Sequence, residues 1–191
     1  MVLFTIQKAH CSLSATTPAI ECSQPGAERH LVEMGHTDVM LYTVRDATLA
    51  DHEDLEGVFR RASLSNEDDR DSLQRHPEWL ALSELGIHEG RMRLATDEEG
   101  AVAGFATFVI KDGVAELEDL FVDPEHRRRR IAELLVLDIS GRMRELGFET
   151  MEVTANPHAM AFYEHMGFVA YDLVETEFYA APRMRRNTAT Q

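Results

Sequence analysis

The sequence predicts a mixed α+β domain in which strands and helices are built around a shared core. Apolar residues make up 44% of the 191 positions, which is enough to form such a core in a chain of this length. Strand-like runs follow one another between residues 92 and 122. A clear helical period of apolar residues comes next, between Ile131 and Leu146. Strands and helices continue to alternate after that point, which completes a mixed order of elements.

Residues 1–40 differ in composition from the rest of the chain. They contain both cysteines, Cys11 and Cys22, two of the six prolines and a cluster of Ser and Thr, without a strand or helix period. We therefore expect a flexible N-terminal extension over 1–40, a single domain over 41–183 and a C-terminal tail over 184–191. A disulfide between the two cysteines stays open, whereas a disulfide framework for the whole fold is excluded.

The first regular segment, Leu41–Arg45, is strand-like and is followed by a break at Asp46–Thr48. Thr48 is expected to cap a helix, with Asp51 three residues later as in a capping box. One apolar face of this helix consists of Leu55, Val58 and Phe59. The charged stretch Asn66–Asp71 is expected to be a solvated loop. It leads into a second helical segment whose apolar residues are Leu73, Trp79, Leu80 and Leu82.

Three strands are predicted next, at Met92–Ala95, Val102–Ile110 and Val114–Val122. The turn between the first two is Asp97–Gly100, and Lys111–Gly113 has the composition of a hairpin turn. Together the three strands would form a meander.

The clearest element is the helix that begins at Ile131. Its apolar residues fall at helical spacing, and Gly147 occupies the place of a C-terminal glycine stop. A strand is predicted at Phe148–Thr154, a short helix from Asn156 to Gly167, and a last strand at Phe168–Glu175.

Acidic side chains outnumber basic ones by 34 to 19, which gives a formal net charge of −15 at pH 7. Nucleic acid and anionic membranes carry the same sign of charge, so neither is expected as a partner, whereas a cationic substrate is compatible. The absence of a long apolar run and of a basic, apolar leader predicts a cytoplasmic protein. The nine histidines are scattered without metal-ligand spacing, and no metal is expected.

Four consecutive arginines, Arg127–Arg130, stand immediately before the predicted long helix. They repel one another and also face the partial positive charge of a helix N-terminus, which is unfavourable unless an anion binds there. Free N–H groups at helix N-termini bind phosphates well. The run therefore indicates a phosphate site, with a solvated basic loop or a nuclear-localisation-like run as the alternatives.

The strand Val114–Val122 carries two carboxylates, Glu116 and Glu118. Strand alternation places them on one face, with Leu120 and Val122 beyond them. Two neighbouring carboxylates repel, which raises the proton affinity of one of them. A carboxylate with a raised pKa can act as a general base toward an ammonium group. A solvent-facing acidic edge is the alternative.

The segment Asn156–Phe168 contains a tyrosine, Tyr163, on the predicted short helix. Phe162 and Met166 are expected to pack, whereas Tyr163 carries a hydroxyl that can donate a proton. A role in packing is the alternative for Tyr163.

In this order and at this spacing, the three features resemble the GNAT superfamily of acetyl-CoA-dependent N-acetyltransferases. The resemblance covers about residues 41–181 and is most specific over 116–132 and 156–168. The cofactor signature of the family, Q/R-x-x-G-x-G/A, falls on Arg127–Ala132, whose first and last residues conform. Arg130 occupies the position of the first glycine, which lets backbone N–H groups approach a pyrophosphate. Arg130 would either crowd that site or turn outward and add a charge-assisted contact to a phosphate, and we expect binding to be retained or weakened rather than abolished.

The resemblance implies a central, mostly antiparallel, splayed sheet flanked by helices, with acetyl-CoA as cosubstrate and without a metal. It implies that backbone at Phe121 and Val122 pairs with the pantetheine arm and polarises the thioester carbonyl. It places the pyrophosphate on Arg127, Arg128, Arg129, Arg130, Ile131 and Ala132. Asn156 would hydrogen-bond the pantetheine arm from the opposite strand.

The resemblance also implies the catalytic residues. Tyr163 matches the tyrosine that protonates the departing thiolate in many members. Glu118 matches a carboxylate used for substrate binding or proton removal, with Glu116 as the fallback. The acceptor site would be built mainly by His52–Leu82 and the late segment Val174–Arg186.

The resulting interpretation is an N-acetyltransferase that moves an acetyl group from acetyl-CoA to a primary amine of a small molecule or peptide. Because no cysteine lies within 41–183, direct transfer in a ternary complex is expected rather than an acyl-cysteine route. The main alternative is a non-catalytic acyl-CoA-binding or sensor domain, because Arg130 departs from the signature. The resemblance leaves a homodimer open.

Overall fold

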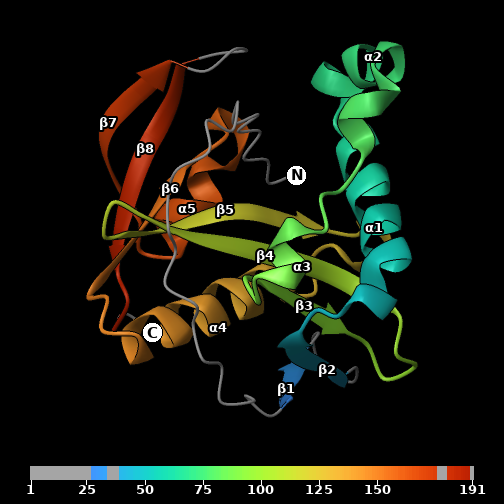
Figure 1. Cartoon of the computed structure of the whole chain (residues 1–191), viewed down its shortest axis with the longest axis horizontal. Helices are drawn as coiled ribbons and strands as arrows, with labels where there is room; N and C mark the ends of the chain where they lie inside the picture. The colour runs from blue at the N-terminus through green and yellow to red at the C-terminus, as the bar shows by residue number, and fades with distance from the viewer. Residues whose placement is uncertain (1–26, 34–38, 176–179, 190–191) are drawn as a thin grey trace.

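The computed structural model describes residues 27–33, 39–175 and 180–189, which form one eight-stranded sheet with helices packed on both faces (Figure 1). The strands are β1 (Glu28–Glu33), β2 (Val39–Asp46), β3 (Met92–Thr96), β4 (Val102–Lys111), β5 (Val114–Val122), β6 (Thr150–Thr154), β7 (Val169–Glu175) and β8 (Ala180–Asn187). The helices are α1 (His52–Leu64), α2 (Glu67–Arg75), α3 (Leu85–His88), α4 (Ile131–Glu145) and α5 (Met160–His165). Single 3₁₀ turns are η1 (Leu49–Asp51), η2 (Pro77–Leu80), η3 (Pro124–His126) and η4 (Pro157–Ala159).

The strand order is β1-β2-β3-β4-β5-β6-β8-β7. Neighbouring strands pair antiparallel, except that β5 and β6 run parallel. In Figure 1 the β7–β8 hairpin lies at the end of the sheet far from α1 and α2. The predicted mixed α+β fold with a mostly antiparallel sheet is confirmed.

The sheet extends beyond the boundaries expected from the sequence at both ends. β1 lies inside the expected extension 1–40 and pairs with β2 from Glu28↔Val44 to Glu33↔Val39. β8 continues to Asn187, inside the expected tail 184–191, and pairs with both β6 and β7. The two cysteines, and the rest of 1–26, lie outside the described residues.

α2 occupies much of the stretch that was expected to be a loop at Asn66–Asp71. Asn66 keeps an extended backbone, and the helix begins at Glu67. Its sequence has a single apolar residue, Leu73, which is 5% exposed and packs in the α1-side core. One apolar residue in nine gives no helical period, so hydrophobic patterning could not detect this helix.

Two apolar clusters pack the helices onto the two faces of the sheet, one under α1 and one under α4. Phe105 of β4 packs with α1, whereas its neighbour Ala106 belongs to the cluster under α4. Successive strand residues point to opposite faces, so the central strands are buried on both sides. The α4 cluster includes Leu117, Leu120, Ile131, Leu135, Ile139 and Tyr163, and the α1 cluster includes Leu55, Val58, Leu94, Phe105 and Phe121.

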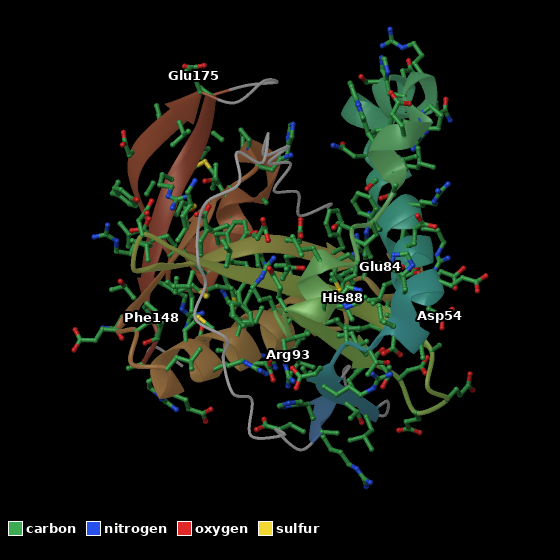
Figure 2. The ribbon with its side chains drawn as sticks, viewed as in Figure 1. Asp54, Glu84, His88, Arg93, Phe148 and Glu175 are labelled. Atoms are coloured by element: carbon green, nitrogen blue, oxygen red, sulfur yellow. The ribbon has the colours of Figure 1, made fainter. Side chains whose placement is uncertain are left out.

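A buried arginine ties α4 to the sheet. Arg93 on β3 (Figure 2) has a side chain only 3% exposed. Its Nε and Nη2 donate to Asp138 of α4 at 2.7 and 2.8 Å. Its Nη1 lies 2.8 Å from a carboxylate oxygen of Asp46 at the end of β2. Two carboxylates offset the cost of burying the guanidinium group, and the pairing fixes the position of α4 over β2 and β3.

Two local predictions are confirmed. Thr48 and Asp51 form the capping box before α1, where the Thr48 N–H and hydroxyl both donate to Asp51 at 2.8 and 2.7 Å. In the hairpin between β4 and β5, Asp112 and Gly113 have φ values of 52° and 79°. Positive φ at two successive residues is what an Asp-Gly hairpin turn requires.

Within the described ranges, the helices are too short or too polar to cross a membrane. Among the same residues, His, Cys, Asp and Glu side chains do not gather in groups of three or more that would hold a metal ion.

Candidate active site

The central feature of the site is the point where β5 and β6 separate. The two strands pair only through Ala115–Leu117 and Met151–Val153. β5 continues to Val122 against β4, whereas β6 stays paired with β8 as far as Thr154. The second half of β5 therefore presents an edge without a strand partner within the described part of the chain.

The backbone of this edge offers hydrogen-bond donors. The Asp123 N–H donates to the Ala103 carbonyl at 2.9 Å, on the β4 side. Because N–H groups point alternately to the two sides of a strand, the N–H groups of Val122 and Leu120 point to the open side. An extended ligand can pair with this edge in the way that an added strand does.

A β-bulge shapes the middle of β5. Phe108 lies opposite Leu117 and Thr107 lies opposite Asp119, so that Glu118 is an extra residue in the ladder. Thr107 and Val109 share a face of β4, and their partners Asp119 and Glu116 therefore share the matching face of β5.

This bulge corrects one sequence expectation. Leu120 and Val122 were expected to continue the face of the carboxylates. Both pack instead in the α4 cluster, on the opposite face, because the extra residue shifts the alternation by one position.

Glu116, the fallback base, is tied into an ion pair. Arg183 of β8 contacts both of its carboxylate oxygens, with Nη2–Oε2 at 2.9 Å and Nη1 on Oε1. Arg183 also reaches Glu152 of β6 at 3.0 Å. Burial raises the pKa of Glu152, but hydrogen bonds from Tyr171, Arg185 and Arg183 outweigh it and hold the pKa below its usual value.

Glu118, the preferred base of the sequence interpretation, is also engaged. Arg91 contacts a Glu118 carboxylate oxygen through Nη1 at 3.1 Å and Glu89 through Nε at 2.6 Å. The Arg91 side chain is 9% exposed and also donates to the Phe108 carbonyl at 2.7 Å.

Asp119 is a carboxyl group that sequence reasoning missed. Burial and, to a smaller extent, the negative charge of Glu118 raise the pKa of Asp119 to about 7, although a hydrogen bond from Thr107 and the charge of Arg91 act in the opposite direction. The adjacent pair Glu118-Asp119 was the only signal for it in the sequence, and the bulge that brings Asp119 to the face of Glu116 has no sequence signature here.

The arginine run opens α4 as the sequence predicts. Arg130 is the N-cap residue and has φ 56° and ψ 16°, and Arg128 has φ 63°. Both are in the left-handed region that glycine adopts most easily. The first backbone hydrogen bond of α4 runs from the Leu134 N–H to the Arg130 carbonyl, so the N–H groups before it are available to an anion.

The four guanidinium groups point to different places. Arg130 is turned outward, with a side chain 63% exposed and Nη2 at 2.7 Å from Glu133. Arg128 is exposed as well. Arg127 instead donates to the hydroxyl of Ser65 at the end of α1, and Arg129 reaches the Tyr42 hydroxyl and His126 Nδ1 at 3.5 Å. Crowding of the loop by the Arg130 side chain is therefore avoided.

Close packing holds this loop against β5. Gly104 of β4 lies opposite Val122, and a Cβ at Gly104 would lie 2.7 Å from the Phe121 carbonyl oxygen and 3.2 Å from Ile131 Cγ2. From the α1 side, Phe59 packs edge-on against the Phe121 ring at a centroid distance of 4.9 Å. Arg61 of α1 is also paired with Asp123, at 2.6 Å.

The remaining predicted residues come from the segment after β6. Asn156 is 2% exposed, and its side-chain oxygen accepts the His158 N–H at 2.9 Å as the cap of η4. Tyr163 on α5 is fully buried in the α4 cluster, with its ring edge-on to Phe162 and Phe168. The structure thus places Tyr163 on the α4 face of the sheet and Glu116 on the opposite face, in the stretch where β5 and β6 are still paired.

Comparison with known proteins agrees with this architecture. Solved structures with the same fold include the N-acetyltransferase PaiA from Thermoplasma acidophilum in complex with coenzyme A, at 21% identity and a TM-score of 0.61, covering 76% of this chain and 98% of that one. A GCN5-related N-acetyltransferase from Rhodopseudomonas palustris has 20% identity and a TM-score of 0.59, covering 80% and 99%.

A third similar structure is N-acetylglutamate synthase from Neisseria gonorrhoeae, complexed with coenzyme A and L-arginine. It has 16% identity and a TM-score of 0.57, covering 76% of this chain and 33% of the larger protein. No curated protein matches the sequence. Residues 57–168, more than half of the chain, match the family described as Acetyltransferase (GNAT) family. The chain is thus a member of the GNAT acetyltransferase family.

Proposed function

We propose that the protein transfers an acetyl group from acetyl-CoA to a primary amine, directly and within a ternary complex. The observation that carries the proposal is the combination of an open β5 edge and a free helix N-terminus at the end of the same strand. The first can bind an extended, amide-containing arm and the second a pyrophosphate, and acetyl-CoA contains both groups in that order.

The residues present fit this cosubstrate. The Val122 and Leu120 N–H groups would bind the pantetheine arm and the acyl carbonyl along the edge that also holds Phe121. The N–H groups of Ile131 and Ala132 would bind the pyrophosphate, with Arg127–Arg130 supplying positive charge. The Asn156 oxygen is used in the η4 cap, so its amide N–H₂ is the group that would reach the arm. Acetyl-CoA, when bound, supplies an activated acetyl group on a thioester.

The chain supplies the proton chemistry. We assign Tyr163 the proton that the departing thiolate would take, and its complete burial supports this role because it would shield the proton from bulk water. Glu116 and Glu118 are held by Arg183 and Arg91, which supports a role in shaping the acceptor side of the gap. The absence of cysteine after residue 22 in the sequence favours direct transfer.

The acceptor is proposed to be a small-molecule or peptide amine. Its ammonium form is a cation, and the net charge of −15 favours the approach of cations over anions. α1 and α2 on one side and the β7–β8 hairpin on the other would frame its entrance.

A second candidate is a non-catalytic acyl-CoA-binding or sensor domain. It is favoured by one observation: Arg128 and Arg130 hold left-handed conformations in the loop where a glycine would fit without strain. Such a domain would bind acetyl-CoA and leave the thioester intact.

The two candidates differ in turnover. The test measures acetyl-CoA binding by calorimetry, and thiol release with a panel of polyamines, aminoglycosides and peptides with free amines. We expect binding, and amine-dependent thiol release with at least one class. Binding without release across the panel would favour the sensor domain, and absence of binding would contradict both.

A further inference from the structure

We propose that Asp119, rather than Glu118 or Glu116, accepts the proton that the acceptor ammonium group must lose before it attacks. This inference rests on the proposed function and assigns one step of it to a residue that the family signature does not point to. It starts from the three carboxylates that the bulged strand β5 presents.

Two of these carboxylates already have cationic partners. Arg183 contacts both oxygens of Glu116, and Arg91 lies 3.1 Å from Glu118. Both contacts to Arg183 favour the ionised form of Glu116, so a proton on Glu116 would oppose them. Asp119 has no ion pair within the described residues, although it is directly next to Glu118 and shares a face with Glu116.

The surroundings of Asp119 keep its proton affinity high. Burial, together with the adjacent charge of Glu118, raises the pKa of Asp119 to about 7. From β4 it is faced by Thr107, and from the segment before β3 by Arg91, which lowers the pKa and is itself shared with Glu89.

Two further titratable groups lie on α3 and its N-cap residue. His88 and Glu84 are 3.6 Å apart and both more than half exposed (Figure 2), and neither is among the groups that shift the pKa of Asp119. α3 itself approaches β4 at Gly86, where a Cβ would lie 3.2 Å from Thr107 Cγ2. The proton affinity of Asp119 is therefore set by burial, Glu118, Thr107 and Arg91.

These properties suit a general base. A base works best when its pKa lies near the pH at which it operates, because it is then both deprotonated and able to hold a proton. A carboxylate of ordinary pKa would hold the ammonium proton too weakly to favour its removal.

Proton removal and acetyl transfer conserve atoms and charge. One N–H bond of the ammonium group breaks, its electron pair stays on nitrogen, and the proton joins an oxygen of Asp119. The nitrogen then forms a bond to the acetyl carbon as the carbon–sulfur bond breaks. Tyr163 gives a proton to the thiolate and regains one from the second N–H of the amine, and Asp119 later returns its proton to water.

The test uses three forms of the full-length chain: wild type, Asp119→Asn and Glu118→Gln. We expect kcat/KM of the wild type to fall below a pH of about 7, following the titration of the base in the free enzyme. Asp119→Asn should lose this acid limb and lower kcat by about 10²- to 10⁴-fold, with acetyl-CoA binding unchanged. Glu118→Gln should keep the acid limb and move it to lower pH, because one negative charge is removed.

A second readout does not depend on activity. A carboxyl group whose pKa is higher in the folded than in the unfolded chain destabilises the fold once it ionises. The melting temperature of Asp119→Asn minus that of the wild type should therefore increase as the pH rises from about 4 to about 7. A constant difference across that window would overturn the proposal, and so would an acid limb that Asp119→Asn leaves in place.

The outcomes also separate this inference from the function on which it rests. Two outcomes would contradict the role of Asp119 but not the acetyltransferase function. In the first, Asp119→Asn turns over with an unchanged acid limb of its pH profile. In the second, Glu118→Gln abolishes that acid limb. A wild type that binds acetyl-CoA but acetylates none of the amines counts against the acetyltransferase and removes this step with it.

Discussion

The left-handed conformation of Arg130 makes a stability prediction that can be worked out from the loop. Arg130 has φ 56° at the entrance of α4, where an L-residue with a side chain costs roughly 1–2 kcal/mol relative to a right-handed conformation. Arg130→Gly removes this cost. It adds conformational freedom to the unfolded chain, worth about 0.4–1 kcal/mol, in the opposite direction.

The side chain contributes a smaller term. The exposed pair between Arg130 and Glu133 is three residues apart on the helix, and such pairs contribute about 0.2–0.5 kcal/mol. Arg130→Gly should then stabilise the chain by about 0.5 kcal/mol, whereas Arg130→Ala keeps the strained backbone, loses the pair and should destabilise it slightly. Arg128→Gly is the matched control. Arg128 has φ 63° and no pair to lose among the described residues, so its gain should be at least as large.

The assay is urea unfolding of the four proteins at neutral pH, with acetyl-CoA calorimetry on the same samples. We expect the glycine variant to be more stable than the alanine variant at position 130, and to bind acetyl-CoA at least as tightly as wild type. An alanine variant as stable as the glycine variant would refute the reasoning, because the backbone would then carry no left-handed strain.

Further predictions concern proton donation, packing and the ion-pair network. Tyr163→Phe keeps the ring and removes the hydroxyl, and it should lower turnover about ten- to a thousand-fold with acetyl-CoA binding unchanged in calorimetry. Gly104→Ala should cost about 1–3 kcal/mol in urea unfolding because its Cβ meets the β5 backbone, whereas Gly141→Ala, where a Cβ on α4 meets nothing within 4 Å, should stabilise by up to about 1 kcal/mol. Arg183→Met removes both cationic contacts of Glu116 and one counter-charge of Glu152, and it should cost about 3 kcal/mol at neutral pH. The pKa of Glu152 is lowered in the folded chain, so the destabilisation caused by Arg183→Met should become smaller as the pH falls below about 4. Chemical unfolding at a series of pH values would measure this change.

Local patterns in the sequence were sufficient to predict much of the framework. The capping box at Thr48 and Asp51, the Asp-Gly hairpin and the long helix after the arginine run all depend on neighbouring residues, and all three are present. Arg130 turns outward, as in one of the two predicted alternatives, and pairs with Glu133, whereas its contact to a phosphate stays a prediction. The roles assigned to Tyr163 and Asn156 stay predictions.

The features that were missed depend on distant partners. The bulge in β5 depends on pairing with β4, and without it neither the position of Asp119 nor the opposite face of Leu120 could be foreseen. Arg183 lies 67 residues from Glu116 and was outside any motif. β1 had no recognisable pattern and is held by its ladder with β2, so the boundary at residue 41 could not be corrected from composition.

The most direct test of the central claim follows the acetyl group itself. The protein is mixed with acetyl-CoA carrying an isotopically labelled acetyl group and with the amine panel, and products are identified by mass spectrometry. The account predicts that the label appears on the nitrogen of a primary amine, in amounts that match the thiol released and fall sharply in Tyr163→Phe. Label that stays on coenzyme A with every amine, or that reaches the amine equally well without the protein, would contradict it.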